Sequence, residues 1–180
     1  MSGYCASAPG HPLHGPYHDT EYGFPVADET VLFERLCLEI FQAGLSWELV
    51  LRKRPGMNAA FDGFQVDRVA AYGEAEVARL LVDAGIIRNR LKVAAIIENA
   101  RRVQALRASH VGFADWLAVQ DAVDKADWVK RFRRTFKFMG GEVVGEFLMS
   151  IGHLPGAHHA NCPIHRKILR LSPPWLTKGR

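Results

Sequence analysis

The sequence has no apolar run long enough to cross a membrane. A membrane-spanning helix needs about 20 consecutive apolar residues, whereas the apolar stretches of this chain are short and interrupted by charged residues. The first residues also lack the order of a secretory signal peptide, in which a basic segment precedes an apolar one. These absences argue against a membrane-bound or secreted protein, and we expect an intracellular one.

Cysteine is scarce, with three residues at Cys5, Cys37 and Cys162. An odd number of cysteines in a chain without a secretory signal argues against a disulfide framework. Cys37 lies between two leucines, a context that favours a small buried hydrophobic residue. Cys5 and Cys162 lie near opposite ends of the chain among histidines, so metal binding and simple burial both remain open for them.

The sequence also lacks internal repeats, low-complexity tracts and the apolar-polar alternation of half-buried strands. From Asp28 onward, apolar residues recur with the spacing of amphipathic helices, and Asp28 and Ser46 precede two helical segments as N-caps. Pro55 and Gly56 should end the second of these helices. The pattern predicts an all-α fold with helices at 29–42, 47–54, 66–72, 74–83, 88–107, 113–119, 125–136 and 141–151, and a helical turn at 58–64.

The length and composition are sufficient for one domain. A chain of 180 residues, 48% of them hydrophobic, buries a sizeable core. We place this domain at residues 1–168 and expect residues 169–180 to form a basic, proline-containing tail with the composition of a disordered segment.

Positive charge and a hairpin pattern point toward nucleic acid. Lys and Arg outnumber Asp and Glu by 23 to 19, a net charge of +4, which is compatible with a polyanionic partner but does not require one. Within residues 83–92, a glycine-containing turn separates two predicted helices, and its N–H groups and the second helix dipole suit a DNA phosphate. An ordinary helical hairpin with solvated basic residues is the alternative. In a helix-hairpin-helix motif the DNA contacts would come from Gly85, Ile87, Arg88, Arg90 and Lys92.

Two thiols and two imidazoles near the chain ends form a candidate metal site. Two Cys and two His residues are typical ligands of a closed, tetrahedral, structural Zn²⁺ site. His158 and Cys162 are four residues apart and could chelate from one helical turn, whereas Cys5 and His18 need a loop to bring them together. By spacing alone, unrelated surface histidines are the slightly better explanation, and His159 is a rival ligand to His158.

Glu39 is a carboxylate within the apolar run of the helix at 29–42. A buried carboxylate is costly unless it is hydrogen-bonded or functional, so Glu39 could line a cavity. It lies at the edge of the apolar stripe, and a partly exposed position without a functional role fits equally well. Trp47 comes shortly after Glu39 in the sequence and is a candidate for stacking on a bound ring. A tryptophan is, however, more often a core residue than a stacking surface.

Four segments carry a combination of motifs that is more specific than any one of them. They are Tyr17-His18-Asp19-x-Glu21-Tyr22-Gly23; Leu36-Cys37-Leu38-Glu39 with Gln42-Ala43-Gly44-Leu45-Ser46-Trp47; Asp83-Ala84-Gly85-Ile86-Ile87-Arg88-x-Arg90-x-Lys92; and Phe136-Lys137-Phe138-Met139-Gly140. In order, spacing and length this combination resembles the 3-methyladenine DNA glycosylase I family. The resemblance extends from Cys5 to about His165.

The resemblance implies a helix-hairpin-helix glycosylase that hydrolyses the N-glycosidic bond of 3-methyladenine in double-stranded DNA and leaves an abasic site. It implies that Glu39 hydrogen-bonds the extruded purine in the base pocket, that Tyr17 contacts this base and that Trp47 stacks on it. It also implies one structural Zn²⁺ per chain, joining the two chain ends through Cys5, His18, His158 and Cys162. No lysine is an evident Schiff-base nucleophile, so we expect no strand cleavage. We expect a monomer in the bacterial cytosol, without an obligate protein partner.

The sequence departs from the family pattern at aromatic positions. Ser7 and His14 stand where the family has aromatic residues, and Tyr22 stands where a tryptophan is common. Fewer aromatic faces predict an altered substrate range or weaker base binding. Two alternatives follow: an alkylpurine glycosylase with a different preference, and a non-catalytic protein that binds damaged DNA.

Overall fold

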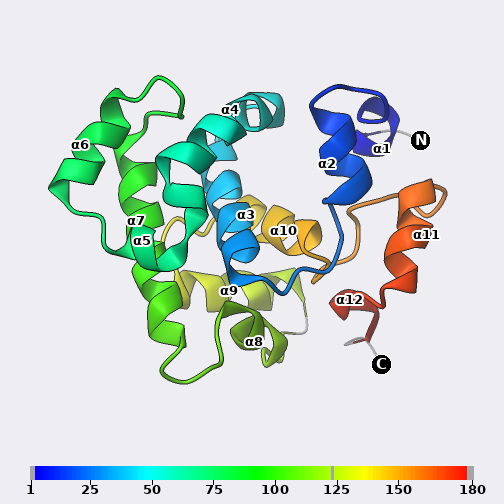
Figure 1. Ribbon diagram of the computed structural model, residues 1–180. Helices are drawn as coiled ribbons and strands as arrows, with labels where there is room; N and C mark the ends of the chain where they lie inside the picture. Colours follow the sequence, from blue (N-terminus) through cyan, green and yellow to red (C-terminus); the bar gives the residue numbers. More distant parts are fainter. Residues whose placement is uncertain (1–2, 123, 178–180) are drawn as a thin grey trace. The chain divides into compact units, whose positions relative to one another are not determined.

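The computed structural model describes residues 3–122 and 124–177, and every regular element in these ranges is a helix (Figure 1). The all-α prediction is therefore confirmed. The chain forms two compact units. Residues 27–144 form one, here called the middle unit, and residues up to 26 together with those from 145 onward form the other, here called the terminal unit. None of the helices in the described ranges is long and apolar enough to cross a membrane.

The middle unit is built around α3 (Glu29–Gln42). This helix begins as predicted, because the Asp28 carboxylate accepts a hydrogen bond from the Val31 N–H at 3.0 Å. The predicted apolar stripe of α3 is fully buried, and the helix contacts α4, η1, α5, α7 and α8. The elements that follow are α4 (Trp47–Ala60), η1 (Asp62–Phe64), α5 (Val66–Ala70), α6 (Glu74–Val82), α7 (Arg90–Leu106), α8 (Phe113–Ala118), α9 (Lys125–Thr135) and α10 (Gly141–Ser150), which contains the boundary between the units.

The predicted end of the second long helix is wrong, because α4 continues through Pro55 and Gly56 to Ala60. Pro55 lacks the N–H that would bond to the carbonyl of Leu51, which normally weakens a helix. The helix persists because Met57 and Ala60, beyond the proline, are buried in the middle unit. Tertiary packing thus outweighs the local signal.

The helix after the hairpin also begins later than predicted, at Arg90 instead of Arg88. The side-chain oxygen of Asn89 accepts a hydrogen bond from the Lys92 N–H at 3.1 Å, and this cap fixes the start of α7. Arg88 therefore belongs to the turn between α6 and α7.

The terminal unit combines both ends of the chain in one core. Cys5, Cys162, Ile164 and Ile168 form this core, and Phe24 packs against it. Neither end carries enough apolar residues for a core by itself, so each depends on the other. The helices are α1 (Tyr4–Ser7), α2 (His14–Thr20), the end of α10, α11 (Pro163–Arg170) and α12 (Pro174–Thr177), the last of which lies within the predicted tail.

Candidate functional site

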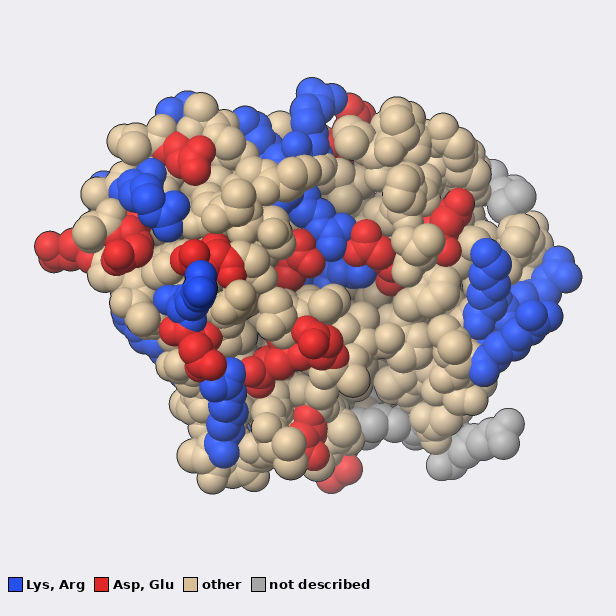
Figure 2. Space-filling model, viewed as in Figure 1, with Lys and Arg blue, Asp and Glu red and all other residues tan. Residues whose placement is uncertain are grey.

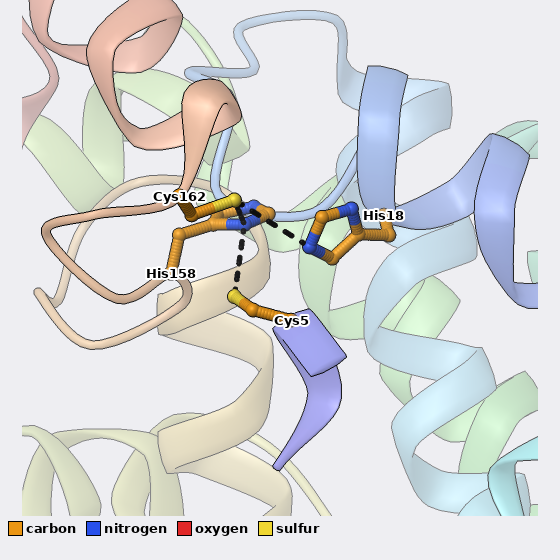
Figure 3. A group of neighbouring side chains, drawn as sticks. All are labelled: Cys5, His18, His158 and Cys162. Atoms are coloured by element: carbon orange, nitrogen blue, oxygen red, sulfur yellow. Dashed lines mark hydrogen bonds between the residues drawn. The ribbon is translucent and has the colours of Figure 1, made fainter. Parts of the chain in front are cut away.

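Four potential metal ligands converge in the terminal unit (Figure 3). Cys5 lies in α1 and His18 in α2, while His158 and Cys162 lie in the segment that leads into α11. The Nδ1 atom of His158 is 3.6 Å from each of the two Sγ atoms, and His18 Nε2 is 3.8 Å from Cys162 Sγ. All four donor atoms lie within 4.8 Å of one another, and all four residues are buried.

These distances fit a tetrahedral metal ion. With metal–sulfur and metal–nitrogen bonds of about 2.3 and 2.0–2.1 Å, sulfur and nitrogen ligands of one Zn²⁺ are separated by about 3.6 Å. Two soft thiolates and two imidazoles leave no coordination position open to water. The cluster can therefore hold a metal ion as a structural centre, consistent with zinc.

Hydrogen bonds orient both imidazoles toward the centre of the cluster. His158 Nε2 is 2.7 Å from the carbonyl oxygen of Tyr22, and His18 Nδ1 is 2.7 Å from the Asp19 carboxylate. Both partners can only accept, so these nitrogens carry the hydrogens and leave His158 Nδ1 and His18 Nε2 as ligands. This second layer of hydrogen bonds is typical of metal-binding histidines.

Burial also shapes the protonation of the cluster. It lowers the pKa of His158, which favours the neutral imidazole that a metal requires. It raises the pKa of the Cys5 thiol, and the nearby Cys162 adds to this rise. A metal must therefore displace the thiol proton when it binds.

His159 is not a member of the cluster, although it neighbours His158 in the sequence. Its side chain is exposed, whereas His158 is 6% exposed and faces the cysteines. The segment from His158 to Cys162 is a loop that ends at Pro163, the first residue of α11. The chelation from one helical turn that the spacing allowed is therefore wrong for this pair.

Aromatic rings surround the metal-ligand cluster within the terminal unit. The Tyr4 ring makes edge contacts with His18 and Tyr22, each at 5.6 Å between ring centroids, and Tyr22 lies at the same distance from Tyr17. Tyr17 is 2% exposed in α2. Tyr4 was not anticipated from the sequence, because nothing local to it signals that an N-terminal residue reaches this cluster. It supplies a tyrosine ring in the terminal unit, where it also makes an edge contact with the ring of His14 at 5.5 Å between centroids.

Glu39 and Trp47 belong to the middle unit. Glu39 lies in the last turn of α3 and is 4% exposed, so the partly exposed alternative for this residue is wrong. Trp47 is the first residue of α4 and is half-buried. Ser46 caps that helix, since its hydroxyl accepts a hydrogen bond from the Leu49 N–H at 3.3 Å.

The turn between α6 and α7 is held by hydrogen bonds at its tip. The Asp83 carboxylate accepts a hydrogen bond from the Gly85 N–H at 2.7 Å, and Lys53 of α4 donates to the Ala84 carbonyl at 2.6 Å. Arg88 and Arg90 are exposed. Lys92 is different, because it is 5% exposed and its ammonium group donates to carbonyl groups of the middle unit.

The lysines and arginines that the structure describes include some that are engaged in hydrogen bonds or ion pairs and some that are not. Arg101, Arg102 and Arg107 bind carbonyl or carboxylate groups of the middle unit. Among the described residues, Arg88 and Arg90 make no ion pair or side-chain hydrogen bond. The same holds for three exposed residues of α11 in the terminal unit, which are Arg166, Lys167 and Arg170. Figure 2 shows a cluster of Lys and Arg side chains over this helix.

The methyladenine glycosylase family model matches residues 7–132 of the chain. The chain belongs to this family. Its resemblance to 3-methyladenine DNA glycosylase I, stated from the motifs, is thereby confirmed.

Similar members of the family match almost end to end. DNA-3-methyladenine glycosylase 1 of Escherichia coli is 37% identical over 88% of this chain and 94% of its own length. DNA-3-methyladenine glycosylase of Haemophilus influenzae is 31% identical over 91% of this chain and 98% of its own length. A solved structure of a 3-methyladenine DNA glycosylase I variant in complex with 3-methyladenine is 27% identical, with a TM-score of 0.80, covering 91% of this chain and 97% of that one.

The structure brings the predicted metal ligands together, and the other predicted residues belong to one or the other of the two units. The metal-ligand cluster lies in the terminal unit, as does Tyr17, whereas Glu39 and Trp47 lie in the middle unit. The hairpin residues also belong to the middle unit.

Proposed function

We propose that this protein is a monomeric DNA glycosylase that hydrolyses the N-glycosidic bond of 3-methyladenine in double-stranded DNA. The observation that carries the proposal is the 37% identity over 88% of the chain with the E. coli DNA-3-methyladenine glycosylase 1. The related structure that holds 3-methyladenine supports the same base as substrate. We also propose that the protein acts in the bacterial nucleoid and surrounding cytosol, where a DNA substrate lies.

The chemistry of the substrate requires little acid catalysis. The enzyme must first extrude the nucleotide from the duplex, which costs a few kcal/mol. The 3-methylated adenine is cationic as a nucleoside, so it leaves as a neutral base with the electron pair of the broken C1′–N bond. Water then adds to the oxocarbenium-like sugar and loses a proton to solvent. The product is an abasic site in an intact strand.

Glu39 is our candidate for recognition of the cationic base. As a carboxylate it accepts a hydrogen bond from the exocyclic amine and favours positive charge on the purine, an interaction that burial strengthens. The 4% exposure of Glu39 supports this role, because little water would screen the attraction between its charge and a cationic base. Trp47, half-buried at the start of α4, would stack on the base, and we also propose a contact between the purine and Tyr17.

Zn²⁺ is the metal we propose for the Cys5, His18, His158 and Cys162 cluster. The donor set, the spacing of the donors and the orientation of both imidazoles support it. When bound, the ion would supply a cross-link between the first twenty residues and the segment before α11. A closed set of four protein ligands has no position for substrate or water, so its contribution is to folding.

DNA binding is proposed for the hairpin between α6 and α7. Backbone N–H groups near Gly85 and Ile87 would bind a phosphate, assisted by the positive end of the α7 dipole. Arg88 and Arg90 are exposed and engaged with no other described residue, which leaves them available for phosphates.

The test is release of free 3-methyladenine from N-methylated duplex DNA by the purified protein. We expect release by the wild type and a loss of about 100-fold or more in the Glu39→Gln variant, which keeps the shape of the side chain but removes its charge. Glu142→Gln is the matched control, because Glu142 is 87% exposed on α10 and should not affect release. Equal rates for wild type and Glu39→Gln would refute the role of Glu39.

The same assay separates the alternatives that arise from Ser7 and His14. Release of another alkylated purine in place of 3-methyladenine would indicate an altered substrate range. Binding to damaged or abasic DNA without release of any base, by folded and metal-loaded protein, would indicate a non-catalytic damage-binding protein.

A further inference from the structure

Lys92 is a buried cation without a carboxylate partner among the described residues. Its Nζ donates to the carbonyl oxygen of Phe41 at 2.7 Å and to that of Ala43 at 2.6 Å. These carbonyls lie at the C-terminal end of α3, where helix carbonyls lack helical partners and the dipole is negative. The ammonium group therefore satisfies the end of this helix.

The backbone that Lys92 binds connects Glu39 to Trp47. Glu39 lies one turn before Ala43, whose N–H donates to the Glu39 carbonyl at 3.2 Å. The chain then turns through Gly44, at a positive φ of 79°, and enters α4 at Trp47. Two of the residues proposed to bind the base, Glu39 and Trp47, are thus attached to the segment that Lys92 holds.

The backbone of Lys92 belongs to the hairpin, whereas its side chain reaches α3. Lys92 is in the first turn of α7, and its own N–H donates to the Asn89 side chain that caps this helix. One residue therefore connects the first turn of the helix after the hairpin with the end of the helix that carries Glu39. All of these contacts lie within the middle unit.

A contact between Lys92 and a DNA phosphate, which the sequence predicts, would require this ammonium to leave two carbonyl groups. Both carbonyls would then lose this donor, and that of Phe41, a fully buried residue, would be costly to leave unsatisfied. Burial also lowers the pKa of Lys92, because a desolvated environment disfavours the charged ammonium group.

We propose that Lys92 is a positioning residue, which holds the segment between Glu39 and Trp47 in register with the DNA-contacting hairpin. The inference rests on the proposed glycosylase function. It assigns Lys92 to the orientation of the base-binding residues and leaves the binding of the DNA backbone to Arg88 and Arg90.

The test compares Lys92→Met, which keeps the length of the side chain but not its donors, with Lys92→Arg, which keeps donors. Three quantities are measured for each: the single-turnover rate of 3-methyladenine release at saturating enzyme, the Kd for undamaged duplex, and the dependence of this Kd on salt. Arg90→Met gives the reference behaviour of a phosphate contact. Lys125→Met, an exposed residue of α9, is the control for loss of one positive charge.

We expect Lys92→Met to lower the saturating rate by about tenfold or more, with the Kd for undamaged duplex within about twofold of wild type and the same salt dependence. Lys92→Arg should recover part of the rate. Exchange of the Leu45 amide hydrogen, which bonds to the Gln42 carbonyl at 2.7 Å, should be faster in Lys92→Met. This last readout needs no catalysis, so it remains informative if the wild type releases no 3-methyladenine and the proposed function fails.

A weaker Kd with a reduced salt dependence and an unchanged saturating rate would overturn the proposal, because that is the behaviour of a phosphate ligand. Unchanged rate, Kd and amide exchange would overturn it as well. If circular dichroism shows that Lys92→Met is not folded, Lys92→Gln replaces it, since a single shorter donor should give the same change in rate and exchange.

Discussion

A Cβ atom on Gly56 would lie 2.4 Å from the carbonyl oxygen of Gly85. No real side chain tolerates such a distance to backbone, so α4 and the hairpin turn meet at a point that only glycine can occupy. The Lys53 ammonium, which donates to the Ala84 carbonyl at 2.6 Å, joins the same two elements beside it. The hairpin that we propose to contact DNA is therefore held against α4 by backbone packing.

Gly56→Ala should destabilise the protein by about 1–3 kcal/mol, the usual cost of inserting a methyl group into a packed interior. Urea unfolding followed by circular dichroism measures this change. Gly140→Ala is the matched control, because a Cβ at Gly140 meets no heavy atom within 4 Å and its φ is not in the left-handed region. Equal free energies of unfolding for the two variants would show that the hairpin moves away from α4 without cost.

His158→Gln and His159→Gln test the choice between two neighbouring histidines. His158→Gln should leave the protein with less than one bound zinc per chain. It should also lower the free energy of unfolding by about 3 kcal/mol or more, because loss of a structural metal is among the most destabilising changes a single substitution can cause. His159→Gln should keep its zinc and its stability, since the side chain is exposed and outside the cluster. Metal analysis and thermal unfolding check both. Zinc loss in the His159 variant alone would reverse the assignment.

The helices of the middle unit were predictable because their apolar periodicity and their caps agree. Asp28 and Ser46 each accept the hydrogen bond expected of an N-cap. The prediction failed at Pro55 and Gly56, where the local signal for a helix end competes with burial of the residues that follow. The contact that explains Gly56 involves a residue far along the chain, and no local pattern contains it.

The metal-ligand cluster likewise depends on contacts between distant segments, which local sequence patterns do not predict. Its ligands come from opposite ends of the chain, and spacing alone could not distinguish them from surface histidines. The family resemblance identified the set, and the structure brings the four side chains together. Local rules had no means of finding Tyr4, whose ring packs on His18.

Lys92 was grouped with Arg88 and Arg90 because all three are basic and close to the turn. The position of Lys92 around the helix, however, indicated that its side chain faces the core and not the solvent. Lys92 lies four residues before Ile96, which is fully buried, so the two share one face of α7. Arg88 precedes the helix, and Arg90 lies on its exposed side.

Replacing Arg88 and Arg90 together with alanine should weaken binding to undamaged duplex and reduce its salt dependence. The slope of log K against log salt is negative, and each lost phosphate contact reduces its magnitude by about 0.9, so a reduction of about 1.8 is expected for the pair. Fluorescence anisotropy at several salt concentrations measures the slope. Lys125→Ala with Lys130→Ala removes the same charge from α9 and should leave the slope near that of wild type. A similar decrease in both double variants would indicate a general effect of net charge.

Cys37 should make the protein less stable in alkaline solution. It is fully buried in α3, and burial, aided by the negative charge of Glu34, raises the pKa of its thiol well above the usual range. In the unfolded chain the thiol ionises near pH 8.5. Above that pH the folded state therefore binds more protons than the unfolded state, and the free energy of unfolding falls as pH rises, by about 1.4 kcal/mol per pH unit from this one group.

The comparison that isolates this effect is unfolding of wild type and Cys37→Ala between pH 8 and pH 10. Alanine leaves a small cavity and lowers stability at every pH, but it has no proton to lose. The difference between the two proteins should therefore shrink by about 2 kcal/mol over this range, while contributions from Lys92, Tyr72 and the zinc ligands are common to both and cancel. A constant difference would mean that the Cys37 thiol ionises as readily in the folded protein as in the unfolded chain.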